Sequence, residues 1–236
     1  MVSIINQPET KSFLSYLDQW ISDLPVLSLS EFSENPEKTA IISVDVIKGF
    51  CNQGALSSPR VAEIVKPIVE LMKNAWDKNI RHIILSQDTH EPQAVEFSSW
   101  PPHCIRGTEE AETVDEIKQL SFFEQIKVLE KNSIASGLNK DLQRWVVDHP
   151  EVDKYIVVGD CSDLCTYQLA MFLRLDANER QLQREVILPE NCVQTYDMPV
   201  EIAQNVGAFP HPGDFIHSVF LNHMALNGIK VVKKIN

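Results

Sequence analysis

The chain has 236 residues, of which 33 are acidic and 21 basic, so its formal net charge at pH 7 is −12. A surface this acidic repels nucleic-acid phosphates and anionic lipids, so we expect neither nucleic acid nor membrane as a partner. Hydrophobic residues make up 44% of the chain, enough for a sizeable core, and none of its eight glycines lies in a dinucleotide- or phosphate-binding motif.

The first 38 residues predict a helical extension. Their start lacks a basic segment followed by a long apolar run, and no apolar stretch in the chain reaches the ~18 residues that span a bilayer, so we expect a cytoplasmic protein. Apolar residues recur there at helical spacing: Phe13, Leu14, Leu17, Trp20 and Ile21. A polar stretch, 28–38, follows. We therefore expect an N-terminal helical extension over 1–38 and one domain over 39–236.

Six short apolar runs, rich in β-branched residues, follow along the chain: 40–45, 80–85, 127–129, 155–159, 185–188 and 229–232. Near-continuous apolar runs of this length are typical of strands buried on both faces, as in a parallel sheet. Amphipathic stretches lie between several of them: 61–78, 138–147, 164–177 and 215–226. This alternation predicts one α/β sheet with helices on both faces.

Polar and reactive residues stand where these strands end. Asp45, Asp88 and Lys131 each end a predicted strand, and the fourth strand runs into the segment 161–165. Open α/β sheets bind their ligands at the carboxyl ends of the strands. The sequence therefore predicts a functional site at this edge of the sheet.

Cys165 is the candidate nucleophile. It stands where the helix over 164–177 should begin, and the positive end of a helix lowers the pKa of a thiol there. Asp45 could act as the base for this thiol, or it could cap a helix or pair with a basic residue. Lys131 could favour the thiolate by its charge, or be an ordinary solvated lysine. From its position alone, Cys165 could equally be a small residue packed in the core.

Four residues of metal-ligand type fall within sixteen positions: Asp88, His90, Glu96 and His103. A carboxylate and an imidazole two residues apart at a strand end point the same way, and the following loop, stiffened by prolines, can close a site around a divalent ion. The pattern indicates a metal site at the same sheet edge. Other cysteines and histidines have ordinary interpretations: Cys104 and Cys192 as small packing groups, and His211, His217 and His223 as surface or packing residues.

The candidate site residues and the motifs around them resemble those of a known family, the isochorismatase-like cysteine hydrolases, and within it most closely the nicotinamidases or pyrazinamidases. The resemblance covers about residues 40–233 and rests on these motifs in order: Asp45 with Phe50, Asp88-x-His90, Trp100-Pro-Pro-His103-Cys-Ile-x-Gly107-Thr108, Lys131, and Gly159-x-x-Ser162-Asp163-x-Cys165. Three positions depart from the family's pattern: the segment 46–49 after Asp45, Ser162 in place of threonine, and Glu109-Glu110 in place of Pro-Gly.

The resemblance implies a Rossmann-like three-layer α/β/α fold with a six-stranded parallel sheet. It also implies a catalytic triad of Asp45, Lys131 and Cys165 and a cis peptide before Cys161. Phe50 and Trp100 would sandwich a pyridine ring. The implied metal ligands are Asp88, His90 and His103, with Glu96 where some members place a further ligand.

The function implied is the hydrolysis of nicotinamide to nicotinic acid and ammonia through a cysteine thioester, a step of NAD salvage. Backbone N–H groups of Cys161 and Cys165 would stabilise the oxyanion. We expect one divalent metal ion, zinc first, although such ligands also suit iron and manganese. Alternatives are another small ureido or carbamoyl amide as substrate, a non-catalytic ligand-binding protein, and a metal-only hydrolase with a structural Cys165. Cys161 could be an oxidation partner of Cys165, and the sequence leaves homo-oligomer formation open.

Overall fold

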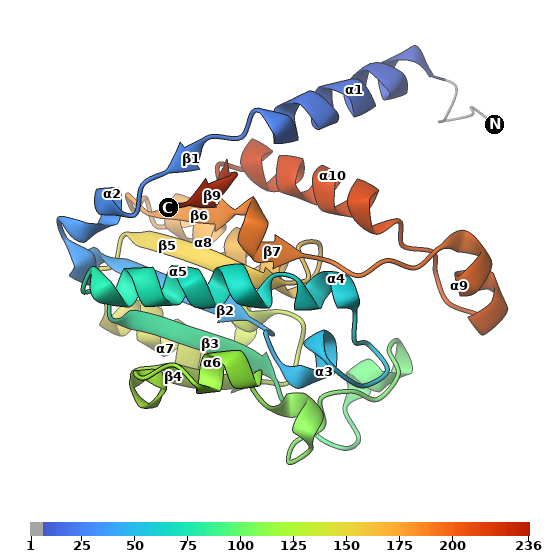
Figure 1. Ribbon diagram of the computed structural model, residues 1–236, viewed down its shortest axis with the longest axis horizontal. Coiled ribbons are helices and arrows are strands. Elements are labelled where there is room, and N and C mark those ends of the chain that lie inside the picture. The colour runs from blue at the N-terminus through green and yellow to red at the C-terminus, as the bar shows by residue number, and fades with distance from the viewer. Residues whose placement is uncertain (1–6) are drawn as a thin grey trace.

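The computed structural model describes residues 7–236, and a parallel β-sheet runs through its centre (Figure 1). Six strands lie in the order β4-β3-β2-β5-β6-β8, and every neighbouring pair is parallel. Their bounds are β2 Thr39–Val44, β3 His82–Asp88, β4 Lys127–Lys131, β5 Lys154–Asp160, β6 Glu185–Pro189 and β8 Lys230–Val232. A short β7, Val193–Gln194, pairs with β5. The predicted six-stranded parallel sheet is confirmed.

Helices cover both faces of this sheet. The α-helices are α1 Pro8–Ser22, α2 Ser30–Ser33, α3 Lys48–Cys51, α4 Pro59–Ala62, α5 Val65–Asp77, α6 Asp115–Lys118, α7 Lys140–Asp148, α8 Cys165–Glu179, α9 Val200–Val206 and α10 Gly213–Leu226. Six 3₁₀ turns lie between them: η2 Pro36–Lys38, η3 Val95–Ser98, η4 Glu109–Ala111, η5 Phe123–Gln125, η6 Ser136–Leu138 and η7 Glu190–Cys192. No helix in the described part of the chain is long and apolar enough to cross a membrane.

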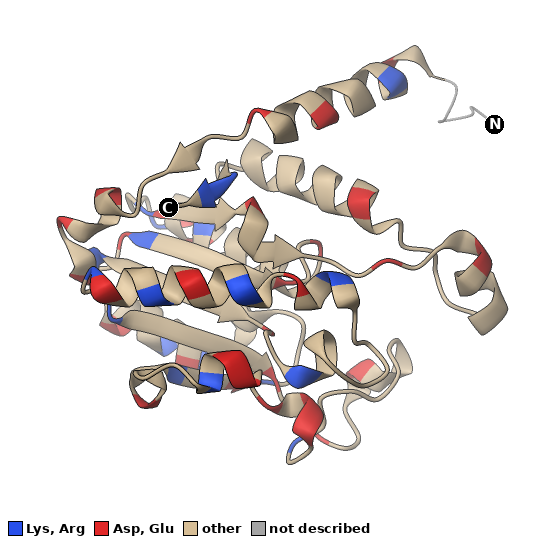
Figure 2. Ribbon diagram, viewed as in Figure 1, with Lys and Arg blue, Asp and Glu red and all other residues tan. Residues whose placement is uncertain are grey.

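The alternation of side chains along the strands builds two cores, one on each face. Ile41 of β2 packs with Ile68 and other residues of α5, whereas its neighbour Ile42 packs on the opposite face with Leu169 and other residues of α8. The solvent face of α5 carries alternating charges, basic then acidic, as Figure 2 shows. This amphipathic pattern explains why α5 lies flat against the sheet.

Two predicted elements differ in detail from the structure. The single helix expected over 61–78 is divided into α4 and α5. Glu63 and Ile64 keep right-handed helical dihedral angles, but the N–H of Ile64 bonds three residues back to Val61, which makes a turn between the two helices. The N-terminal extension contains the expected α1, but it also contributes β1, Val26–Leu27, which pairs in parallel with β9, Lys234–Ile235. Two-residue strands are too short for a periodic pattern to reveal. Whether 1–38 and 39–236 are separate units stays a prediction.

Candidate active site

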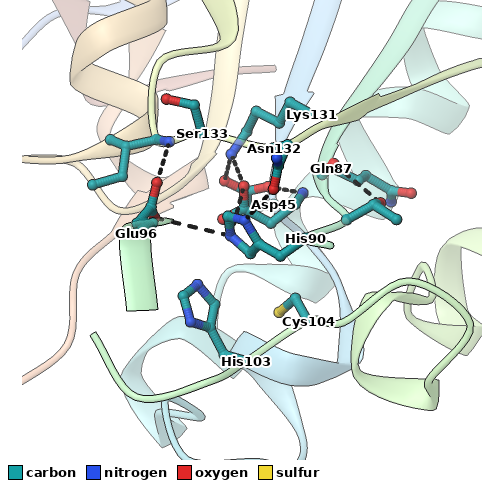
Figure 3. A network of polar contacts seen from close by, with 12 residues as sticks. Asp45, Gln87, His90, Glu96, His103, Cys104, Lys131, Asn132 and Ser133 are labelled. Atoms are coloured by element: carbon teal, nitrogen blue, oxygen red, sulfur yellow. Dashed lines mark hydrogen bonds and ion pairs between the residues drawn. The ribbon is translucent and has the colours of Figure 1, made fainter. Parts of the chain in front are cut away.

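Three charged side chains meet at the carboxyl ends of adjacent strands. Lys131, the last residue of β4, places Nζ 2.8 Å from Asp45 Oδ2 and 2.5 Å from Asp88 Oδ1 (Figure 3). The exposed fractions are only 1% for Asp45, 1% for Asp88 and 3% for Lys131. Asp45 Oδ1 also accepts a hydrogen bond of 2.7 Å from the backbone N–H of Asp88. Lys131 is therefore a buried counter-ion to two carboxylates and not a solvated surface lysine.

The thiol of Cys165 lies against this group. Cys165 is the first residue of α8 and is buried, and a set of ligand atoms from Asp45, Asp88 and Cys165 lies within 4.8 Å of one another. Burial, reinforced by Asp88, raises the pKa of Asp45 to about 6, although Lys131 acts in the opposite direction. The carboxyl of Asp45 is thus tuned toward neutral pH, as a general base requires.

The thiol of Cys165 is less acidic than its position at the start of a helix predicts. Burial raises the pKa of this thiol well above its ordinary value, with Lys131 only partly opposing the effect. The sequence prediction of an acidified thiol is wrong in this respect, because the depth of burial was not visible from its position at a helix N-terminus. A base beside the thiol is therefore needed to form the thiolate.

The loop before α8 has the expected backbone. The peptide bond between Asp160 and Cys161 is cis. The carbonyl of Cys161 accepts hydrogen bonds from the N–H groups of Leu164 and Thr166, and the N–H of Ser162 donates to the carbonyl of Gln194. These bonds fix the turn that presents Cys165. The oxyanion role of the Cys161 and Cys165 N–H groups stays a prediction.

A second cluster adjoins the first, and its atoms suit a divalent cation. One ligand atom from each of Asp88, His90 and His103 lies within 4.8 Å of the others. His90 Nδ1 lies 3.0 Å from Asn132 Oδ1, and His103 Nδ1 lies 2.8 Å from the carbonyl oxygen of Pro101. Each ring thus has its Nδ1 engaged outside the cluster, the arrangement usual for metal-ligating histidines. His90 Nε2 is buried without a hydrogen-bond partner, which fits a position reserved for a metal.

Glu96 lies at the margin of this cluster. Its Oε1 is 3.9 Å from His90 Nε2, and its Oε2 accepts a hydrogen bond of 3.4 Å from the N–H of Ile134. The compact group of three does not include it. Asn132, which orients His90, was not predicted, although its position directly after Lys131 at a strand end was the available signal.

The two residues predicted to bind the pyridine ring contact different aromatic side chains. The ring of Phe50 is 5.6 Å from that of His103, so Phe50 adjoins the metal-type cluster. Trp100 makes an edge contact with Tyr196, at 6.5 Å between ring centroids. Tyr196 follows β7 in an irregular segment, where sequence periodicity gave no signal for it.

Several known proteins are similar to this chain in sequence or in fold. Nicotinamidase 1 of Arabidopsis thaliana is 26% identical over 235 residues, covering 93% of this chain and 96% of the relative. The pyrazinamidase of Pyrococcus horikoshii, solved in complex with zinc, superposes with a TM-score of 0.64 at 22% identity, covering 83% of this chain and 99% of that one. N-carbamoylsarcosine amidase of Thermoplasma acidophilum gives a TM-score of 0.59 at 21% identity over 83% and 96%.

The family assignment rests on a match to a family model. The isochorismatase domain matches residues 39–231, from the first residue of β2 to the middle of β8. That span contains the parallel sheet up to the middle of β8 and every predicted site residue. This chain belongs to the isochorismatase domain family.

Proposed function

We propose that this chain is an amidohydrolase that converts nicotinamide to nicotinic acid and ammonia. The observation that carries the proposal is the buried contact group of Cys165, Asp45 and Lys131 directly beside the Asp88, His90 and His103 cluster. The similarity to a nicotinamidase over nearly the whole chain supports the choice of substrate. Such a reaction would serve NAD salvage, in the cytoplasm.

The first half of the reaction forms a thioester. Asp45 takes the proton of Cys165, and the sulfur bonds to the carboxamide carbon while the carbonyl electrons move to oxygen. The N–H groups of Cys161 and Cys165 stabilise that oxygen, which can contribute ~3–4 kcal/mol when such donors are preorganised. As the carbonyl re-forms, the C–N bond breaks and Asp45 gives its proton to the departing nitrogen, which leaves as ammonia.

The second half restores the thiol. Asp45 takes a proton from water, whose oxygen bonds to the thioester carbon, and the C–S bond then breaks. The sulfur recovers the proton from Asp45, and nicotinic acid leaves. Lys131 stabilises the charged form of Asp45 throughout, because its ammonium is within 2.8 Å of that carboxylate.

A divalent ion, with zinc as our first choice and iron or manganese as alternatives, would be held by Asp88, His90 and His103, with Glu96 adjacent. When bound, it would orient the substrate by accepting the pyridine nitrogen as a ligand. Phe50 adjoins His103 and would cover one face of the ring. Trp100 is proposed for the other face.

The test is a pair of cysteine variants. Cys165→Ala should abolish ammonia release from nicotinamide while the metal content of the purified protein stays unchanged. Cys192→Ala removes an equally buried thiol outside the site and should leave turnover near that of the unchanged chain. Ammonia release that survives Cys165→Ala would overturn the nucleophile and favour a metal-dependent hydrolase.

A second candidate keeps the three residues and changes the amide. The fold similarity to N-carbamoylsarcosine amidase favours a ureido or carbamoyl compound as this alternative. A panel of nicotinamide, pyrazinamide and ureido compounds, with metal content measured on the same sample, separates the two. Turnover confined to ureido compounds in metal-free protein would replace nicotinamide as the substrate. No turnover of any amide would indicate a binding protein.

A further inference from the structure

A second buried acid–imidazole pair involves the loop that precedes the nucleophile. Asp163, in the loop between Cys161 and Cys165, places Oδ2 2.9 Å from Nε2 of His211, which stands just before α10. The other carboxylate oxygen accepts a hydrogen bond of 2.6 Å from the hydroxyl of Thr195. The side chain of His211 is 11% exposed and that of Asp163 is 7% exposed, so this pair is held inside the protein. The chemistry proposed above uses neither residue.

The contacts of His211 determine its charge. Its Nδ1 lies 2.9 Å from the carbonyl oxygen of Tyr196, and its Nε2 faces the carboxylate of Asp163. Since a carbonyl and a carboxylate can only accept, both ring nitrogens must donate, which makes the ring an imidazolium. Burial lowers the pKa of His211, but the contacts with Asp163 outweigh it and the pKa is raised. The pair is therefore a charge-assisted hydrogen bond, stronger than a neutral one.

The same imidazole supports an aromatic side chain at the site. The ring of Tyr196 stacks on His211, with centroids 3.9 Å apart and planes 16° from parallel. Tyr196 also makes an edge contact with Trp100, which lies on the loop that carries His103. His211 thus joins two parts of the site that are distant in the sequence: the loop carrying Cys165 and the aromatic wall at Trp100.

We propose that His211 is a positioning residue that fixes the Cys165 loop through Asp163 and the ring-binding wall through Tyr196. The inference rests on the proposed function for its kinetic consequences. It further assigns Tyr196, beside Trp100, to the wall that receives a flat heteroaromatic amide. We call the contact of His211 with Asp163 the loop arm and its stacking on Tyr196 the wall arm. The loop arm acts on the chemical step, and the wall arm acts on binding of the ring.

Two substitutions separate the arms. His211→Phe keeps a ring that can stack on Tyr196 but removes both hydrogen bonds, so kcat should fall about tenfold or more while KM changes less than about twofold. Tyr196→Leu removes the ring but keeps the carbonyl that accepts from His211, so KM should rise several-fold with a smaller change in kcat. His223→Phe makes the same chemical change on the exposed part of α10 and is the matched control.

A measurement independent of any substrate accompanies the kinetics. The rate at which iodoacetamide alkylates Cys165, resolved by peptide mass spectrometry, should change in His211→Phe and stay unchanged in Tyr196→Leu and in the control. If the unchanged chain releases no ammonia from nicotinamide, the proposed function fails, while the alkylation rates still decide the loop arm.

A gentler variant keeps the inference testable if His211→Phe does not fold. Asp163→Asn keeps an oxygen for Thr195 but loses the charge that holds the imidazolium, so kcat should fall in the same direction by a smaller factor. In a double variant of 163 and 211 the losses should not add, because both changes remove one interaction. A folded His211→Phe with unchanged kcat and unchanged Cys165 alkylation, or a Tyr196→Leu that lowers kcat alone, would overturn the proposal.

Discussion

Lys131 illustrates which contacts of a single residue the sequence predicts and which it does not. Position at a strand end predicted that Asp45, Asp88 and Lys131 would gather at one edge of the sheet, and they do. The pattern assigned Asp88 to a metal site and Lys131 to the thiol separately. It could not show one ammonium shared by two carboxylates, because side-chain direction and burial depend on packing across three strands. Burial also reversed the expected direction of the Cys165 pKa.

Asp160 is a second residue whose burial the sequence did not reveal. It ends β5, is 1% exposed, and its Oδ1 has no hydrogen-bond partner. Burial raises the pKa of its carboxyl well above the ordinary value, with Asp45 adding to the effect. The native state therefore retains a proton that the unfolded chain releases, so the free energy of unfolding falls as pH rises above the ordinary carboxyl pKa.

This predicts that Asp160→Asn stabilises the protein as pH rises. The amide resembles the protonated carboxyl in shape and cannot ionise, so the melting temperature should increase relative to the unchanged chain at pH 8 and differ little at pH 4. Asp148→Asn, at the exposed end of α7, should show no such pH-dependent gain. Thermal melts across this pH range make the comparison, and equal effects at both ends would refute a neutral Asp160.

Among the secondary-structure elements, the hydrophobic pattern predicted the six central strands better than helix breaks, two-residue strands and irregular segments. Each of the six apolar runs became a strand, because continuous burial on both faces leaves a clear signal in composition. The break between α4 and α5 and the strands β1 and β9 went unpredicted, since a few residues carry no measurable period. Segments outside regular elements, such as those that carry Tyr196 and His211 on either side of α9, gave the least information.

The close approach of the neighbouring parallel strands β2 and β5 leads to a prediction about Gly159. This residue has φ +113°, and a Cβ added there would lie 2.0 Å from the carbonyl oxygen of Val44. Gly159→Ala should therefore force the two central strands apart and cost several kcal/mol, giving little soluble protein. Gly207→Ala, also at positive φ but in open space, should cost only about 1 kcal/mol. Soluble yield and melting temperature test the pair, and a stable Gly159→Ala would contradict the close approach.

At the scale of the whole molecule, the N-terminal extension is tied to the rest through the end of the chain. Leu27, Leu29 and Phe32 are buried in the same core as α5. Backbone hydrogen bonds join the extension to the C-terminal residues: Lys233 N–H to Pro25, Asn236 N–H to Leu27, and Leu29 N–H to Asn236. Composition predicted an extension with a helix, but pairing between the two ends of the chain is a long-range contact that no local pattern encodes.

Deleting residues 233–236 should therefore loosen the extension. The three backbone hydrogen bonds to the extension are lost, together with the one from Asn191 N–H to the carbonyl of Lys233. Each contributes about 1 kcal/mol, so the melting temperature should fall by about 5 °C or more. Limited proteolysis should then cut first within residues 23–38. Lys234→Ala keeps the backbone and should leave both measurements unchanged. A deletion variant with unaltered melting and cleavage would show that β1–β9 pairing does not hold the extension.

The pairing of β1 with β9 also sets an order of events during synthesis. β1 at Val26–Leu27 pairs with β9 at Lys234–Ile235, so β1 lacks this partner until β9 has been synthesised. Contacts of such high sequence separation form late, since the entropy of closing a long loop opposes them. Strands β2 to β6 are synthesised well before β9, whereas the segment from Val26 to Phe32 must wait with its apolar side chains unpaired. Synthesis of β9 is thus the earliest moment at which the segment around β1 can be paired as in the folded protein.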